Sequence, residues 1–217
     1  MLQLCKCVLN INYAVNTVMK QNTTIHNYLV FYNAVAFISW AAFLVAYITG
    51  GLQYNSTTLL LLNIAQGMAV LEVLHTLLKW VKSPVGSTLA QVASRILVLV
   101  FINLYLPVYP TATVFKAGLV IISFAWGITE MVRYSFYLLA LLNKQPAALL
   151  WMRYTFFIGL YPTGVTGEWL ILLTPLIVNG FSLSVYSVFA AVLFVIYAYY
   201  FPVLYGYMWK QRKQKLV

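Results

Sequence analysis

Two side chains suited to acid–base chemistry, Tyr161 and Glu168, lie inside a long apolar stretch of the sequence, between Arg153 and Trp169. They are seven residues apart, about two helical turns, so a helix would place both on one face. Ionisable residues are costly within a membrane, and there they are a default indication of function. The chain contains only three acidic residues, and Glu168 is one of them. We therefore take Tyr161 and Glu168 as the candidate catalytic pair.

This pair would supply a base and a proton donor. A phenol with an ordinary pKa near 10 is protonated at neutral pH and can donate a proton. A carboxylate in a dry pocket is poorly solvated and is therefore a better base. We assign Glu168 as the base and Tyr161 as the donor, and the reverse assignment stays open. Because seven residues of helix rise about 10.5 Å, we expect a bend at Pro162 and Gly164 to bring the two groups closer.

The composition indicates an integral membrane protein. Hydrophobic residues make up 63% of the 217 positions and charged residues only 7%, whereas soluble domains carry about 25% charged residues. Six apolar segments each approach the ~20 residues that a membrane-spanning helix needs. They cover residues 28–49, 58–78, 88–106, 113–142, 148–173 and 183–208. We therefore predict an all-α integral membrane protein with six transmembrane helices in one bundle. A cytosolic segment (1–27) precedes the catalytic domain (28–209), and a basic cytosolic tail (210–217) follows it.

The distribution of basic residues predicts the topology. The net charge is +10, and the basic residues outside the apolar segments gather before the first segment, after the second, between the fourth and fifth, and after the sixth. The connections after the first and fifth segments have none, and the third has only Lys116. Because basic residues are retained on the cytosolic side, we expect both termini in the cytosol. The same residues would face anionic lipid headgroups, so their charge does not require a nucleic acid partner.

The remaining charged residues lie within or beside the apolar segments. Arg95, Arg133, Glu72 and Glu130 fall inside them, and Arg153 lies near the start of the fifth. A buried guanidinium keeps its charge and needs acceptors, and Glu130 and Arg133 are spaced to pair on one helical face. These residues either form ion pairs that hold the bundle together or take part in the site.

Several classes of chemistry are excluded by missing residues. Di-iron hydroxylases and desaturases need many histidines, and the chain has two. Glu72 and His75 form one ExxH pair, but a di-iron site would need a second. The sequence has no GxxxxGK, GxSxG or GxGxxG motif, and Cys5 and Cys7 are its only cysteines. We expect no metal and no cofactor. From these residues alone, an acid–base enzyme and a six-span transporter or channel are equally supported.

Four segments carry a resemblance to a known family. YPTGVTGE (161–168) follows Arg153, and LEVLH (71–75), SPVGSTLAQVASR (83–95) and WGITEMVRYSFY (126–137) stand in the same order and spacing as the family's other signatures. Together they resemble the membrane 3-hydroxyacyl-CoA dehydratases of very-long-chain fatty acid elongation, a family also called protein-tyrosine-phosphatase-like. The resemblance covers about residues 28–212, nearly the whole chain.

The resemblance implies a carbon–oxygen lyase that converts a long- or very-long-chain 3-hydroxyacyl-CoA to the trans-2-enoyl-CoA, the third step of the elongation cycle. Tyr161 and Glu168 fall on the family's catalytic pair. The positions that would bind substrate or support the site are Arg95, Arg133, Tyr134, Arg153 and Gly164. The arginines are candidates to meet CoA phosphates. The family's phosphatase-like name came from a cysteine-containing loop, and Thr76 stands at that position here, so no thiol nucleophile is present.

The same resemblance implies a multi-pass protein of the endoplasmic reticulum membrane. Its partners would be the acyl-CoA substrate, the lipid bilayer, and the condensing enzyme, ketoreductase and enoyl reductase of elongation. Lys213 and Lys215 resemble a dilysine retrieval signal, or they anchor the last segment at the cytosolic face. A catalytically inactive scaffold of the elongation complex is a third alternative, beside the enzyme and the transporter.

Overall fold

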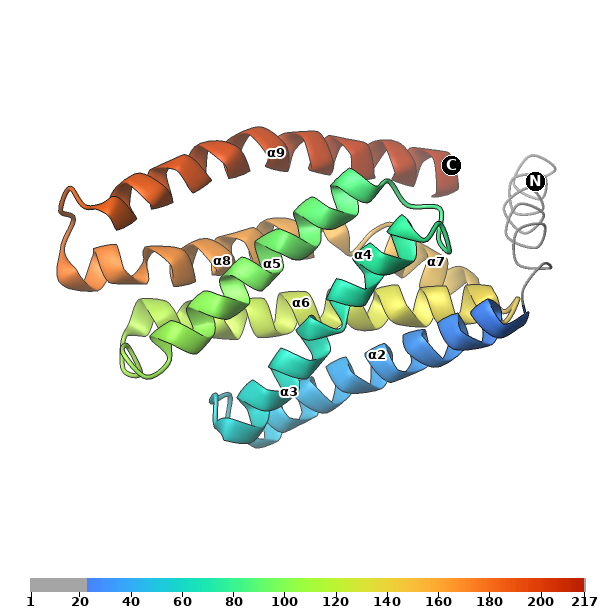
Figure 1. The fold of residues 1–217 in the computed structure, drawn as a ribbon, viewed down its shortest axis with the longest axis horizontal. Coiled ribbons are helices and arrows are strands. Elements are labelled where there is room, and N and C mark those ends of the chain that lie inside the picture. The colour runs from blue at the N-terminus through green and yellow to red at the C-terminus, as the bar shows by residue number, and fades with distance from the viewer. Residues whose placement is uncertain (1–22, 217) are drawn as a thin grey trace.

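The computed structural model describes residues 23–216, and within this range all regular elements are α-helices (Figure 1). The predicted all-α class is therefore confirmed. The expectations for Cys5, Cys7 and most of the 1–27 segment concern residues outside the described part of the chain. The helices are α2 (Thr23–Thr49), α3 (Ser56–Gly67), α4 (Ala69–Leu77), α5 (Val85–Tyr105), α6 (Thr113–Leu141), α7 (Ala147–Arg153), α8 (Phe157–Asn179) and α9 (Val185–Leu216).

The helices follow the predicted apolar segments in order. Five helical stretches are long and apolar enough to cross a membrane, with α3 and α4 together forming one of them. The helices α7 and α8 make a sixth candidate span if they count as one segment, because they meet at an angle of 41° across a short break. The described residues thus contain five or six candidate spans.

Two helices extend beyond the segments that hydropathy alone defined. The helix α8 continues past Pro175 to Asn179 and stops where Gly180 adopts a positive φ of 84°, a backbone conformation that glycine reaches readily and other residues rarely adopt. The helix α9 has 32 residues, about 48 Å at 1.5 Å per residue, and runs through the basic tail to Leu216. Lys213 and Lys215 lie in its last turn, where cations are favoured by the helix dipole.

The helix α6 is the centre of the bundle, and α9 lies at its edge. In Figure 1, α2, α6 and α8 lie side by side, α3, α4 and α5 cross them, and α9 runs along the far side of α8. Half of the most apolar window of α6 is buried, compared with 6% for α9. The start of α2, the helix α7 and the end of α9 all lie at one end of the bundle. This end also carries the basic connections.

Glycines allow α6 to approach its neighbours closely. A Cβ atom added at Gly167 of α8 would lie 2.6 Å from Ile122 Cγ2 and 2.8 Å from Ile121 Cγ2, both on α6. A Cβ at Gly127 would meet Leu44 of α2 at 2.6 Å. These positions bring the backbones together, as small residues do at helix crossings within membranes.

We expect Gly167→Ala to destabilise the fold and Gly164→Ala, one turn earlier on α8, to leave stability unchanged or slightly improved. The first clashes with β-branched isoleucines, whose side chains adjust poorly, and overpacking of this kind costs about 1–3 kcal/mol. At Gly164 the nearest side-chain atom is Ala125 Cβ at 3.6 Å, an ordinary contact. Thermal unfolding in detergent measures both. Equal melting temperatures for the two variants would contradict this account of the α6–α8 contact.

Candidate active site

Glu168 is held at the point where α6, α8 and α9 meet. Its side chain is buried, with 7% of its surface exposed. Trp126 Nε1 of α6 donates a hydrogen bond to Oε1 at 3.1 Å, and the Tyr197 hydroxyl of α9 donates to Oε2 at 2.9 Å. Both carboxylate oxygens are therefore bound by neutral donors from two different helices. Glu168 has no ion-pair partner among residues 23–216.

Tyr161 lies on the same side of α8 and packs against α9. Its ring is stacked on Phe201, with ring centres 5.2 Å apart and an angle of 10° between the planes. The ring of Tyr205 lies nearly parallel to it, at 6.3 Å. Within the described range the Tyr161 hydroxyl makes no hydrogen bond, so it is available to a substrate. Tyr161 and Glu168 thus face one seam between α8 and α9, as their spacing predicted.

The chain has a bend earlier than the one expected at Pro162. The helix α8 runs continuously through Pro162, and the 41° bend lies earlier, between Arg153 and Phe157. Proline lacks an N–H, which leaves the carbonyl of Ile158, four residues earlier, without its helical partner. The Tyr205 hydroxyl donates to that carbonyl at 3.1 Å. This bond from α9 satisfies the orphaned group, and α8 remains helical from Tyr161 to Glu168, about two turns.

The other two carboxylates, buried Glu130 and partly exposed Glu72, belong to one connected ion cluster. Glu130 is 2% exposed and accepts hydrogen bonds from Arg95 of α5 and from Arg133 on its own helix. Arg133 Nη2 also donates to Glu72 Oε1 of α4 at 2.6 Å. The Tyr134 hydroxyl donates a hydrogen bond to the same Glu72 oxygen. The predicted Glu130–Arg133 pair is confirmed, and the cluster ties α4, α5 and α6 together.

The ion cluster and the Glu168 site are neighbours. The Arg95 guanidinium lies over the Trp126 ring, 5.6 Å from its centre, while the indole N–H of Trp126 is directed at Glu168. The structure therefore brings Arg95, Arg133, Tyr134, Glu72 and Glu130 into one cluster beside Glu168. Their contacts support the ion-pair interpretation. Gly164 is buried on α8 between Tyr161 and Glu168, facing Ala125 of α6.

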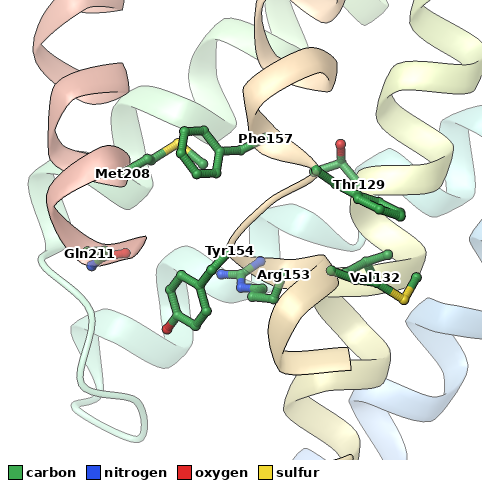
Figure 2. A pocket seen from close by; sticks show the side chains of 9 residues that line it. Thr129, Val132, Arg153, Tyr154, Phe157, Met208 and Gln211 are labelled. Atoms are coloured by element: carbon green, nitrogen blue, oxygen red, sulfur yellow. The ribbon is translucent and has the colours of Figure 1, made fainter. Parts of the chain in front are cut away.

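Arg153 lies apart from this cluster, at the end of α7. Its Nη2 donates to the Tyr137 hydroxyl at 2.9 Å, and its guanidinium lies over the rings of Phe136 and Tyr137. It forms no ion pair with a carboxylate in residues 23–216. Arg153 also lines a pocket between α6, the α7–α8 break and α9 (Figure 2).

The ExxH pair is not arranged as a metal site. His75 shares a hydrogen bond with the Tyr28 hydroxyl at 2.9 Å and stacks on Trp80, while the Glu72 carboxylate is directed at Arg133. In the part of the chain that the structure describes, no three His, Cys, Asp or Glu side chains are grouped so that they could hold a metal ion.

Three residues at the site were missed by reasoning from the sequence. Trp126 stands in the sequence only as the first residue of WGITEMVRYSFY, and Tyr197 and Tyr205 belong to an aromatic run, YAYYFPVLYGYMW (197–209), at the end of the last apolar segment. A usable signal existed in that run. Tyr197, Phe201 and Tyr205 recur every four residues and so share one face of α9. The intervening Tyr199 is 68% exposed and faces away.

Comparison with known proteins finds the same family that the sequence motifs resemble. The family described as "Protein tyrosine phosphatase-like protein, PTPLA" matches residues 66–217. The chain is 42% identical over 160 residues to very-long-chain (3R)-3-hydroxyacyl-CoA dehydratase hpo-8 of Caenorhabditis elegans, covering 70% of this chain and 72% of that protein. It is 33% identical to dehydratase 2 of Mus musculus, covering 87% and 80%, and 36% identical to PASTICCINO 2 of Arabidopsis thaliana, covering 87% and 92%. No solved structure matches the chain.

We expect Glu130→Gln to lower the melting temperature in detergent far more than Glu72→Gln does. The first change leaves Arg95 and Arg133 without the carboxylate that they share, and breaking a buried pair costs about 3–5 kcal/mol. The second is a matched control, because it makes the same chemical change while Arg133 keeps Glu130. A Glu130→Gln protein as stable as the wild type would show that the cluster does not support the fold.

Proposed function

The chain belongs to the protein tyrosine phosphatase-like (PTPLA) family, and from this membership we propose that it removes water from very-long-chain (3R)-3-hydroxyacyl-CoA to give trans-2-enoyl-CoA. The curated relatives carry this dehydratase name, and the chain matches them over most of their length. The structural observation that best supports the proposal is the buried Glu168 carboxylate, which is paired with no cation and faces the same seam as Tyr161. The enzyme is thus a carbon–oxygen lyase of fatty acid elongation.

The reaction needs one base and one acid. Glu168 would take the proton from carbon 2 of the acyl chain, and the electrons of that C–H bond form the double bond between carbons 2 and 3. The bond between carbon 3 and its hydroxyl oxygen breaks, and Tyr161 donates a proton to that oxygen, so that water leaves. The proton on Glu168 then returns to the Tyr161 oxygen, which restores both groups. One acid or base of this kind contributes about 10²–10⁴-fold to the rate.

The surrounding side chains support this division of roles. Trp126 and Tyr197 fix the orientation of the Glu168 carboxylate without neutralising it, because they donate hydrogen bonds but carry no charge. The Tyr161 ring is held by its stacking against Phe201 and Tyr205, while its hydroxyl is left for the substrate. Because carbon 2 and the hydroxyl on carbon 3 are close together, the Tyr161 and Glu168 side chains would have to extend toward each other along the seam to reach both across the ~10.5 Å rise between their backbone positions.

We further propose that α7 and α8 form one bent span, which gives six spans with both termini in the cytosol. The connections 50–55, 106–112 and 180–184, at one end of the bundle, contain no charged residue, and Lys116 near the start of α6 is the one lysine of the described residues at that end; the opposite end carries the other six. This asymmetry supports a cytosolic position for the lysine-bearing end. The dehydratase function supports a location in the endoplasmic reticulum membrane. It also supports the other enzymes of elongation as partners.

Accessibility of single cysteines should report the topology. With Cys5 and Cys7 replaced by serine, Lys144→Cys should react with a membrane-impermeant maleimide on sealed, cytosolic-side-out microsomes. Ser182→Cys, in the α8–α9 connection, should react only after the membrane is permeabilised. Both positions are exposed and lie at opposite ends of the bundle, so they form a matched pair. Labelling of Ser182→Cys on intact microsomes would show that the number or orientation of spans is wrong.

Tyr161→Phe and Glu168→Gln should each lower the turnover of purified protein by about 10²–10⁴-fold, because each keeps the side-chain size and removes the proton chemistry. The measurement is formation of enoyl-CoA from a (3R)-3-hydroxyacyl-CoA, followed as the loss of one water by mass spectrometry. Tyr199→Phe is the control, since it removes a hydroxyl from the exposed face of α9. Near-normal dehydration by either site variant would contradict the assignment of that residue. Unchanged melting temperatures would show that a loss of turnover is not a loss of folding.

A further inference from the structure

A pocket of about 80 Å³ lies at the end of the bundle where α7 and the C-terminal end of α9 meet. Figure 2 shows Thr129 and Val132 of α6 on one side, Gln211 of α9 on another, and Arg153 beside the break between α7 and α8. Phe157, the first residue of α8, also lines the pocket. The pocket is separate from the Glu168 site, and none of the roles proposed above uses it.

The polar groups at this pocket are positive or neutral donors. Arg153 is bound to the Tyr137 hydroxyl and to aromatic rings, and no carboxylate neutralises it within the described residues. The chain has only three acidic side chains. Glu72 and Glu130 are paired in the ion cluster, and Glu168 is bound by Trp126 and Tyr197. A negative ligand would thus meet no repelling carboxylate at the pocket.

Further donor capacity lies beside the pocket and is unused. The Thr155 hydroxyl, in the α7–α8 break between two lining residues, is buried without a hydrogen-bond partner. The same holds for Nε of Arg212, the residue that follows Gln211 on α9. Gln211 donates one amide hydrogen to the Tyr207 hydroxyl and retains a second. Buried polar atoms are rarely left unpaired, and these two belong to residues next in sequence to the pocket lining, although neither residue lines it.

The whole end of the bundle attracts anions. Its lysines lie on the α4–α5 connection, on the α6–α7 connection and along the end of α9: Lys79, Lys82, Lys144, Lys210, Lys213 and Lys215. Clustered charge of one sign raises the local concentration of an oppositely charged substrate. Arginine binds phosphate groups through two parallel hydrogen bonds. The chemistry of the pocket therefore fits a phosphate group.

A continuous path of rings leads from the pocket to the candidate catalytic pair. Phe157, which lines the pocket, packs against Tyr205, and Tyr205 lies parallel to Tyr161. From Phe157 to Glu168 the helix rises through eleven residues, about 16 Å. The pantetheine arm of CoA has about a dozen bonds between the thioester sulfur and the first phosphate, roughly 15 Å when extended at standard bond lengths. A thioester near Glu168 would thus place the CoA phosphates near Arg153.

We propose that this pocket binds a phosphate group of the CoA part of the substrate, with Arg153 as the main contact and the Gln211 amide as a second. The proposal rests on the dehydratase function and locates the other end of its substrate. Arg153 then acts in binding, whereas Arg95 and Arg133 stabilise the bundle through Glu130 and Glu72. An anionic lipid headgroup offers the same phosphate chemistry, and only the CoA phosphate is joined to the group that reacts at Glu168.

The test compares two substrates that differ only in these phosphates. A (3R)-3-hydroxyacyl-CoA and the corresponding 3-hydroxyacyl-pantetheine share the acyl chain and thioester, and the second lacks the nucleotide and its phosphates. Arg153→Gln should raise KM for the CoA thioester about 10- to 100-fold, the value of one or two charge-assisted hydrogen bonds. It should leave KM for the pantetheine thioester and kcat for both unchanged. Lys144→Gln, a control that removes one charge at the same end outside the pocket, should change neither KM by more than about twofold.

A second variant covers the case in which Arg153→Gln does not fold. Gln211→Glu places a negative charge in the pocket and keeps Arg153, so it should raise KM for the CoA thioester alone. Equal KM values of wild-type protein for both thioesters, or equal increases for both in the variants, would overturn the proposal. An effect seen for both thioesters only in bilayers that contain anionic lipid would overturn it in favour of a lipid headgroup. Failure of wild-type protein to dehydrate either thioester would instead refute the proposed function, and the pocket assignment with it.

Discussion

The cost of burying charge in an apolar bundle is the constraint on which this structure depends. A charged side chain in lipid or in a packed core must find a partner or line a functional cavity. Glu130 is shared by Arg95 and Arg133, and Arg133 extends the cluster to Glu72, so three helices are joined by charges that cancel. Glu168 alone among the three glutamates receives only neutral hydrogen bonds. That difference separates the carboxylates that hold the fold from the one that is left for chemistry.

The site is completed by the helix that is least integrated into the bundle. Only one residue of α9 is fully buried, yet α9 supplies Tyr197 to Glu168 and the rings that stack on Tyr161. It also donates the Tyr205 hydrogen bond to the carbonyl that Pro162 leaves without a partner. A single face of α9 thus orients the proposed base Glu168, restrains the Tyr161 ring and satisfies the Ile158 carbonyl. The proposed active site would thus depend on contacts that add little buried area to the fold.

The same cost of burying charge separates Arg95 and Arg133 from Arg153. Arg95 and Arg133 are embedded among carboxylates and aromatic rings, and their contacts reach from one helix to another. Arg153 has aromatic neighbours and one hydroxyl acceptor, at the end of the bundle where the lysines gather. Sequence position alone made the three equivalent candidates for phosphate binding. Their partners in the fold distinguish two that stabilise the bundle from one that is free to meet an anionic ligand.

The sequence by itself determined the helical class, the order of the apolar segments, the Glu130–Arg133 pair and the shared face of Tyr161 and Glu168. All of these follow from local periodicity and composition, which are properties of residues close together in the chain. Tertiary structure alone decided the rest. The helix α8 continues through Pro162, where Tyr205, over 40 positions away, satisfies the freed carbonyl of Ile158, and a 41° bend lies before Phe157. Tyr197 and Trp126 reach Glu168 only because α9 and α6 pack on opposite sides of α8, an arrangement that no local pattern encodes.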